Sequence, residues 1–437
     1  MRPVLRLPWN RGTTAQVCVL RPGSVAGPVS QRGMFVGVDT SAGGAEFCWD
    51  PFEAYAAGLV TNPNVWVLGA PGNGKSALVK SLLWRMAALY PQRWVAIADP
   101  KGEYTTLAER LGMSVVRLSP GGPTRVNPLA DGPAGTDEPL ARRVMRRAAT
   151  VTTLAATVLE RGLTPVEDAA VFAAVADVLG AAGAGQEPTL KDVAGLLLAP
   201  TPAMVQRMHQ SAPDAVASCQ AVYYALDKLL HRSLQGLFDG PSTVRPDWHR
   251  AGLVVDFSAV PMESEAFPLV MVAVAGWLSE LMACPGPQRV QVLDEAWALL
   301  GSRSAACYLQ QCWKLGRGRG VANVGIAHRA SDLAAQADDG TATAKIARGL
   351  LADTATKIIL RQDSEELDAA EKVFGLTSVE KGLVGQLDCG EAVWHVGSHR
   401  AMVVHILGSA ERDLVDTDQR MRSVEGSSAT NSGVLAS

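Results

Sequence analysis

Apolar residues along this chain follow two periods in turn, and their order predicts an α/β fold. Short runs rich in β-branched and aromatic residues are typical of buried strands, and they alternate with stretches in which apolar residues recur every three or four positions, as in helices. The predicted strands are VWVL (65–68), WVAIADP (94–100), GLVVDF (252–257), RVQVLDE (289–295), ANVGIAH (322–328), TKIILRQ (356–362) and EAVWHV (391–396). Because helical stretches such as 265–283 and 303–316 separate them, we expect a mostly parallel sheet.

The pattern changes outside this core, and the changes predict further segments. Residues 1–60 contain the β-like runs QVCVL, MFVGV and EFCW between Gly/Pro turns, which predict hairpins packed beside the core. Residues 137–248 are rich in Ala, Leu and Val at helical spacing, which predicts an all-helical insertion between the two parts of the core, 61–136 and 249–408. Residues 409–437 are polar, and we expect a disordered tail there.

Composition says more about the cellular location and binding partners of the protein than about its fold. The chain has 437 residues, 48% of them hydrophobic, and its net charge of −3 excludes a chain-wide basic field, so any contact with nucleic acid must be local. The seven cysteines form no CxxC pair and are typical of reduced, cytosolic thiols. The first residues, MRPVLRLPWNRG, lack the apolar run expected of a signal peptide, and the longest apolar stretch, 268–278, is about half of a membrane span. We therefore expect a cytoplasmic protein without an intrinsic membrane span.

A glycine-rich turn between the first core strand and its helix matches the phosphate-binding pattern GxxxxGK[ST]. The predicted nucleotide-binding residues are Gly69, Ala70, Pro71, Gly72, Asn73, Gly74, Lys75, Ser76 and Ala77. A turn without side chains lets backbone N–H groups converge on phosphate oxygens, Lys75 reaches the outer phosphates, and the Ser76 hydroxyl is a ligand for Mg²⁺. The turn predicts ATP and Mg²⁺ as cofactors, against the alternative of a glycine-rich connection without a ligand.

The strand VLDEAW supplies the acidic half of such a site. Asp294 and Glu295 end a predicted parallel strand, so both carboxylates belong at the sheet edge where the phosphates bind. We expect Asp294 to hold the Mg²⁺ shell and Glu295 to act on the attacking water. The alternative is an Asp that only caps the next helix, with a solvated Glu beside it.

A second acidic strand end, ADPKGEY, carries Asp99 and Glu103. These two carboxylates could orient the groups that contact the magnesium ion or the attacking water. Helix capping explains Asp99 almost as well, since a helix follows and ends at Gly112.

Arginines that follow the acidic strand are candidates to stabilise the transition state. Phosphoryl transfer often uses an arginine from a neighbouring subunit. Arg317 and Arg319 lie on the turn LGRGRG, and Arg348 and Arg361 come later. The alternative is a helix that ends in basic residues near its own dipole.

Three histidines are candidates for a functional role. His328 ends the strand ANVGIAH, where a polar side chain can sense the γ-phosphate, although a histidine at a strand end is often a satisfied core or edge residue. His395 and His399 are four residues apart, but Gly397 separates them in a predicted strand and turn, which disfavours a metal site.

A basic stripe at helical spacing is formed by Arg142, Arg143, Arg146 and Arg147. Most such stripes are solvated faces. A contact with nucleic acid is the alternative, although no aromatic residues interleave with these arginines.

The order of these motifs resembles the large secretion ATPase of conjugative type IV secretion systems, a family in the HerA–FtsK branch of RecA-like P-loop ATPases. The shared order is GNGKS, DPKGEY, RVNPL, a helical insertion, VVDF, VLDEAW, GRGRG, AHRASDL, ATKIIL and GEAVWHV, over residues 33–407. The resemblance implies a RecA-like core and a hexameric ATPase at the cytoplasmic base of a conjugation channel. Its partners would be its own copies and the inner-membrane channel proteins, and its work would be channel or pilus assembly and substrate transfer.

The resemblance also carries over to single positions. Lys75 and Ser76 match the nucleotide-binding motif, Asp294 and Glu295 match the metal and catalytic acids, and the turn 317–319 falls near a basic motif of the family. The chain departs from the family at His328, where members usually carry Gln. It also departs at the N-terminus, where a large domain that contacts the inner-membrane complex is reduced to a short β-like segment.

Two other functions stay open at this point. A coupling protein or DNA translocase of the same superfamily would pump DNA, but the membrane spans or DNA-reading module usual in such proteins are not visible. A nucleotide-gated scaffold would bind ATP to assemble partners and hydrolyse little, and His328 favours it.

Overall fold

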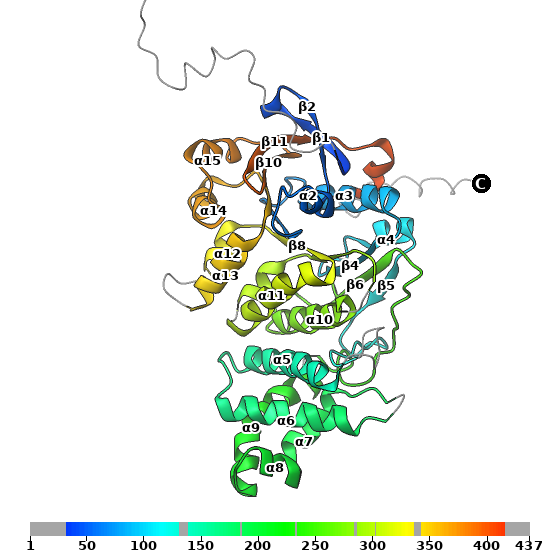
Figure 1. Ribbon diagram of the computed structural model, residues 1–437, viewed down its shortest axis with the longest axis vertical. Helices are drawn as coiled ribbons and strands as arrows, with labels where there is room; N and C mark the ends of the chain where they lie inside the picture. The colour runs from blue at the N-terminus through cyan, green and yellow to red at the C-terminus, as the bar shows by residue number, and fades with distance from the viewer. Residues whose placement is uncertain are drawn as a thin grey trace, which may run out of the picture.

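The computed structural model describes residues 32–130, 139–183, 186–231, 234–283, 286–301, 303–335 and 342–415 (Figure 1). Its strands are β1 (Met34–Asp39), β2 (Ala45–Trp49), β3 (Val65–Leu68), β4 (Trp94–Asp99), β5 (Ser114–Arg117), β6 (Gly252–Asp256), β7 (Arg289–Leu293), β8 (Val321–Ala327), β9 (Thr356–Leu360), β10 (Glu391–Val396) and β11 (His399–His405). Its α-helices are α2 (Pro51–Ala56), α3 (Lys75–Leu89), α4 (Thr105–Leu111), α5 (Leu140–Val158), α6 (Pro165–Ala181), α7 (Leu190–Leu198), α8 (Pro202–Arg207), α9 (Ala212–His231), α10 (Ala266–Met282), α11 (Arg303–Gly316), α12 (Ala330–Ala335), α13 (Ala342–Asp353), α14 (Leu367–Phe374), α15 (Ser378–Val384) and α16 (Arg412–Val415). Short 3-10 helices are η1 (Thr40–Ala42), η3 (Ala296–Leu300), η4 (Arg317–Arg319), η5 (Ser364–Glu366) and η6 (Ser409–Glu411).

Within the described residues the strands form one sheet in the order β2-β1-β11-β10-β9-β3-β8-β7-β4-β6-β5. Neighbours from β9 to β5 pair in parallel, and those from β2 to β9 pair antiparallel. The predicted α/β fold with a mostly parallel core is therefore confirmed. The pattern of apolar residues did not predict β5 or β11. Strand β11 connects the N-terminal hairpin of β1 and β2 to the core sheet.

The N-terminal segment is only partly described. The runs MFVGV and EFCW form the antiparallel pair β1 and β2, as predicted. They extend the central sheet through β11, whereas we expected them beside the core. The third predicted run, QVCVL (16–20), lies outside the described residues.

Alternating side chains of the central strands belong to two separate cores. On β3, Val65 and Val67 pack with helix α3 on one face of the sheet, and Trp66 and Leu68 belong to the core on the other face. A strand with buried residues on both faces is the form expected when helices cover both sides of a parallel sheet. The segment VWVL is therefore apolar at every position, and its end is fixed between two packed layers.

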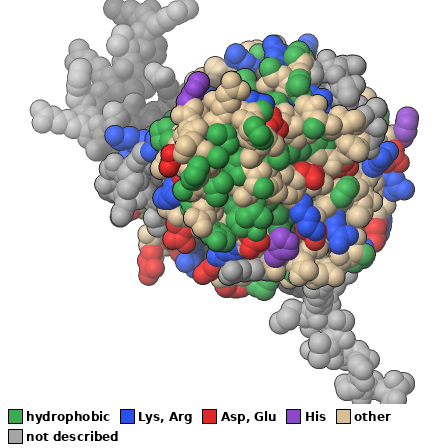
Figure 2. All heavy atoms as spheres, turned by 90° about the horizontal axis from the view of Figure 1, so that it is seen from below, with side chains coloured by type: hydrophobic (Ala, Val, Ile, Leu, Met, Phe, Trp, Pro, Cys, Tyr) green, Lys and Arg blue, Asp and Glu red, His purple; other side chains and the backbone are tan. Residues whose placement is uncertain are grey.

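The helical insertion lies at one end of the molecule. Every regular element described between residues 139 and 231 is a helix, and α5 packs on α10 and α11 of the core (Figure 1). Seen from that end, apolar side chains gather over the middle of the face (Figure 2). Leu198, Val216 and Tyr224 are among the exposed large apolar residues of α7 and α9.

The prediction of a disordered tail from residue 409 is wrong for residues 409–415. Residues 409–415 form η6 and α16, and Leu414 is buried. The Glu411 carboxylate accepts hydrogen bonds from Arg85 at 2.6 Å and from the Ser81 hydroxyl at 3.1 Å, both on α3. A buried ion pair thus holds this segment in an ordered structure, although its polar composition predicts disorder. Residues 416–437 lie outside the described residues.

Across the described part of the chain, no helix combines the length and the apolar character that crossing a membrane requires.

Candidate functional site

The phosphate loop is shaped by glycines and closed by its own lysine. Gly72 and Gly74 have φ angles of 78° and 91°, a region that residues with a Cβ rarely adopt. Gly74 begins α3 without a side-chain cap, so the first N–H groups of the helix remain available to an anion. Lys75 Nζ donates to the carbonyl of Gly69 and, at 3.0 Å, to that of Ala70. Burial, and then the charge of Lys101, lower the pKa of Lys75 to about 8.

Asp294 lies at the end of β7 with one free carboxylate oxygen. Its Oδ1 accepts the N–H of Glu295 at 2.9 Å. Its Oδ2 is buried and has no hydrogen-bond partner among the described residues. Burial, and then the charge of Glu295, raise the pKa of Asp294 to about 7. A buried carboxylate oxygen without a partner is costly unless a cation or a donor is to be bound there.

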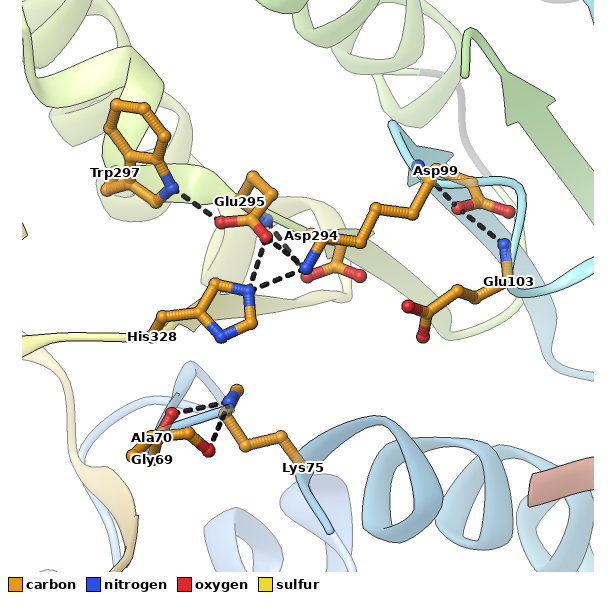
Figure 3. A network of polar contacts seen from close by, with 10 residues as sticks. Gly69, Ala70, Lys75, Asp99, Glu103, Asp294, Glu295, Trp297 and His328 are labelled. Atoms are coloured by element: carbon orange, nitrogen blue, oxygen red, sulfur yellow. Dashed lines mark hydrogen bonds and ion pairs between the residues drawn. The ribbon is translucent and has the colours of Figure 1, made fainter. Parts of the chain in front are cut away.

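Glu295 is held by three donors (Figure 3). Its Oε1 lies 2.5 Å from both Lys101 Nζ and His328 Nε2, and its Oε2 accepts the indole N–H of Trp297 at 2.5 Å. Burial would raise the pKa of Glu295, but the hydrogen bond from His328 and the charge of Lys101 outweigh it and lower the pKa to about 2. This carboxylate is therefore fully charged and firmly held.

Asp99 shapes the loop that carries Lys101. Its carboxylate accepts the N–H groups of Lys101, Glu103 and Tyr104 at 2.9 to 3.2 Å. Burial raises the pKa of Asp99 to about 6, against these hydrogen bonds. These contacts are those expected if Asp99 caps the helix that follows. A role of Asp99 and Glu103 in orienting the groups around the magnesium ion stays a prediction.

His328 follows β8 directly and lies between two groups. Its Nε2 contacts Glu295 and, at 2.6 Å, Lys101. Its Nδ1 is buried and has no hydrogen-bond partner among the described residues. In Figure 3 this nitrogen points to the side on which Lys75 and its loop lie. A neutral ring whose Nε2–H donates to Glu295 has an acceptor at Nδ1, so Nδ1 can donate to phosphate only when it also carries a proton. That role remains a prediction.

The arginines lie at different edges of the sheet. Strands β3 and β8 are parallel and paired from Val65 and Val324. Arg317 and Arg319 precede β8, so they lie at the edge opposite to the phosphate loop of their own chain. Arg361 follows β9 directly, and its carbonyl accepts the N–H of Ala70 at 2.9 Å, so it lies beside the loop. Arg348 lies in α13 with an exposed side chain.

The basic stripe is partly turned inward. Arg146 makes a two-pronged contact with Glu280 on α10, with distances of 2.9 and 2.7 Å, and Arg147 is buried. Arg142 is exposed. Neither a uniform solvated face nor a continuous nucleic-acid contact describes this helix, because α5 packs on the core through part of its basic side.

His395 and His399 do not share a site. His395 is buried and contacts Glu380 at 3.0 Å, whereas His399 is exposed. Among the described residues, no group of three His, Cys, Asp or Glu side chains could hold a metal ion.

The residues at the phosphate edge fit ATP and one Mg²⁺ ion. The loop offers backbone N–H groups and Lys75, Ser76 is half-buried on the first turn of α3, and the free Oδ2 of Asp294 is an oxygen ligand of the kind that Mg²⁺ prefers. Lys101 and Trp297 lie within the motifs DPKGEY and VLDEAW, but no local pattern in the sequence indicates a role for them. Lys80 was also missed: it is buried on α3, 5.6 Å from the centre of the Tyr104 ring.

Comparison with protein-family models finds no match, and comparison with curated proteins finds none. Among solved structures, the chain resembles VirB4 of Thermoanaerobacter pseudethanolicus at 22% identity and a TM-score of 0.68, covering 88% of this chain and 100% of that chain. It resembles the plasmid coupling protein TrwB in complex with ADP and Mg²⁺ at 14% identity and a TM-score of 0.57, covering 89% and 93%. For TrwB in complex with an ATP analogue, the identity is 16% and the TM-score 0.57, and the match covers 93% of this chain and 97% of that chain. The chain therefore has the RecA-like P-loop fold found in VirB4 and TrwB.

Proposed function

We propose that this chain is an ATP-hydrolysing motor of a conjugative type IV secretion apparatus. The observation that carries the proposal is the arrangement of a phosphate loop and two carboxylates, Asp294 and Glu295, at one edge of a parallel sheet. The sheet order brings β3, β8 and β7 side by side, so the three groups meet although up to about 220 residues separate them. The motif order and the fold shared with a conjugative coupling protein support the setting.

In this proposal each residue has one task. Backbone N–H groups within residues 72–77 and the ammonium of Lys75 bind the phosphates. Ser76 and Asp294 hold Mg²⁺, which when bound neutralises charge on the phosphates. Glu295 orients the attacking water, and His328, when protonated on both ring nitrogens, donates to Glu295 from Nε2 and to the γ-phosphate from Nδ1. The Lys75 pKa of about 8 keeps much of its charge at neutral pH, and bound phosphate would restore the rest.

We further propose a hexamer in which Arg317 and Arg319 act on the neighbouring subunit. Their position at the opposite edge of the sheet removes them from their own site, and Arg317 is exposed. Such a motor would work at the cytoplasmic face of the inner membrane through channel proteins, energising channel or pilus assembly and substrate transfer.

Two alternatives each have an observation in their favour. The fold is shared with TrwB, described as a bacterial conjugative coupling protein, which favours a DNA-pumping function. The tight binding of Glu295 by Lys101 and His328 favours a nucleotide-gated scaffold that hydrolyses little.

The test is the ATPase rate per chain across protein concentrations, with Glu295→Gln as the blank and the exposed Glu365→Gln as the matched control. A rate that rises with concentration and disappears only in the Glu295 variant supports a motor with sites shared between subunits. A rate at the blank level throughout, together with tight ATP binding, supports the scaffold. Strong stimulation by DNA supports the coupling protein.

A further inference from the structure

Lys101 lies in the phosphate site but is not part of the phosphate loop. It belongs to the turn between β4 and α4, whose backbone is fixed by the Asp99 carboxylate. Gly102 in this turn has a φ of 70°, and a Cβ there would lie 3.1 Å from the Ser258 hydroxyl, so the turn has little freedom. Any movement of the ammonium must therefore come from its side chain.

Lys101 and its partner Glu295 differ in their freedom to move. The Lys101 side chain is 23% exposed, while that of Glu295 is 2% exposed. Glu295 is also held through Oε2 by Trp297, and its backbone is fixed at a φ of 53° between β7 and η3. In this pair the lysine is the group that can leave.

Lys101 and Lys75 face the same space. Each ammonium is bound to an acceptor that a phosphate could replace: Lys75 to its own loop carbonyls, and Lys101 to Glu295. The charge of Lys101 lowers the pKa of Lys75, so the two cations repel each other across this space, while Asp294 and Glu295 attract both. An anion placed between two lysines removes this repulsion.

We propose that Lys101 is a positioning residue that binds Glu295 in the nucleotide-free protein and transfers to the γ-phosphate when ATP binds. The transfer leaves Glu295 with a free lone pair at Oε1 for the attacking water, and it couples release of the carboxylate to arrival of the third phosphate. His328 remains on Oε1 and keeps the carboxylate in place. This inference rests on the proposed ATP-binding function.

The test separates a contact with phosphate from simple neutralisation of Glu295. In a Glu295→Gln background, hydrolysis is removed and the charge that Lys101 neutralises is gone. We would measure the affinities for ATP and ADP with Mg²⁺, by calorimetry, for Glu295→Gln alone and combined with Lys101→Met. Lys381→Met is the matched control, since Lys381 pairs with Glu371 and Asp368 away from the site.

We expect the preference for ATP over ADP to fall about tenfold when Lys101→Met is added, because a charge-assisted hydrogen bond to the γ-phosphate is lost. Lys101→Arg, which keeps the cation, should retain most of the preference. If the methionine variant unfolds, Lys101→Gln replaces it, with thermal unfolding as the control for the fold.

A change in the preference of less than about twofold would overturn the transfer, because Lys101 would then serve only to hold Glu295. Failure of the Glu295→Gln protein to bind ATP at all is a different result. It would overturn the proposed function, and the inference with it.

Discussion

At the scale of single residues, Glu295 combines a strained backbone with a firmly bound side chain. Its φ of 53° lies in the left-handed region, which costs a residue with a Cβ on the order of 1 kcal/mol. Strain of this kind persists where the surrounding structure holds it, and it is concentrated at functional sites. Here the residue with the strained backbone carries the carboxylate that contacts Lys101 and His328.

The imidazole of His395 should make the stability of the protein depend on pH. Burial, and then the charge of Arg400, lower its pKa to about 4, while an unfolded chain has the ordinary value of 6.5. Between these values the unfolded state binds a proton that the folded state does not, so stability is full above pH 6.5 and is lost as the pH falls toward 4.

The measurement is the urea midpoint of unfolding at pH 7, 6 and 5 for the wild type and for His395→Gln. We expect the variant to lose less stability between pH 7 and 5 than the wild type does. The exposed His399→Gln is the control and should follow the wild type. Equal slopes in wild type and His395→Gln would contradict a buried neutral imidazole.

At the scale of elements, the order of strands explains why distant motifs meet. Strands β3, β8, β7 and β4 are neighbours and parallel, so their polar ends lie at the same edge of the sheet. Gly69, His328 and Asp294 follow their strands directly, and Asp99 is the last residue of β4. Each strand is too short and too apolar to hold a polar site itself. The loops beyond the strand ends carry the chemistry, as in other open parallel sheets.

The short helix α16 and the turn before it should stabilise the core through helix α3. Glu411 is 5% exposed and pairs with Arg85, which also donates to the carbonyl of Ile406 at 2.5 Å. Removal of one partner of a buried ion pair leaves the other charge unpaired. We expect Glu411→Ala to lower the free energy of unfolding by about 3 kcal/mol, measured by urea denaturation.

Asp413→Ala is the matched control on the adjoining helix α16. Asp413 pairs with Arg110 at 3.5 Å, but its side chain is 73% exposed. Exposed pairs of this kind contribute little, so the unfolding midpoint should stay at the wild-type value. Equal losses in both variants would mean that the whole segment, rather than the buried pair, supplies the stability.

At the scale of the whole molecule, the two halves of the proposed site lie at opposite edges of one sheet. The phosphate loop follows the end of β3, and the Arg317–Arg319 turn precedes the start of β8. A chain with this arrangement cannot complete its own site with these arginines. A ring of copies can, if the basic turn of one subunit faces the loop of the next.

Mixing two inactive variants tests this arrangement. We expect Lys75→Ala and the double variant Arg317→Ala/Arg319→Ala each to lose ATPase activity. Their mixture should recover part of it, because an intact loop can then face an intact basic turn. The readout is the rate in the mixture against the sum of the two separate rates.

Recovery well above that sum is the expected result, and Arg361→Ala mixed with Lys75→Ala is the comparison. Arg361 lies beside the phosphate loop of its own chain, so it belongs to the same half of the site as Lys75. If only the Arg361 mixture recovers, the arginine that crosses to the neighbour is Arg361 and the proposal for Arg317 and Arg319 is wrong.

The sequence by itself determined the α/β core and the positions of its polar strand ends. Local spacing is sufficient for this, because a buried strand, a glycine turn and an amphipathic helix each depend on neighbouring residues. The same local spacing predicts Lys75, Ser76, Asp294 and Glu295 as site residues. The helix that follows Asp99 was also found, together with its end at Gly112.

Only the tertiary structure decided which of these groups touch. The contact of Lys101 with Glu295 and His328 joins residues 194 and 227 positions apart, and it depends on the order of β4, β7 and β8 in the sheet. Tertiary packing also decides three other features: the contact of Arg146 with the core, the sheet edge on which Arg317 lies, and the packing of Glu411 on α3. Strand order and packing are set by the balance of burial over the whole chain, and no local pattern encodes them.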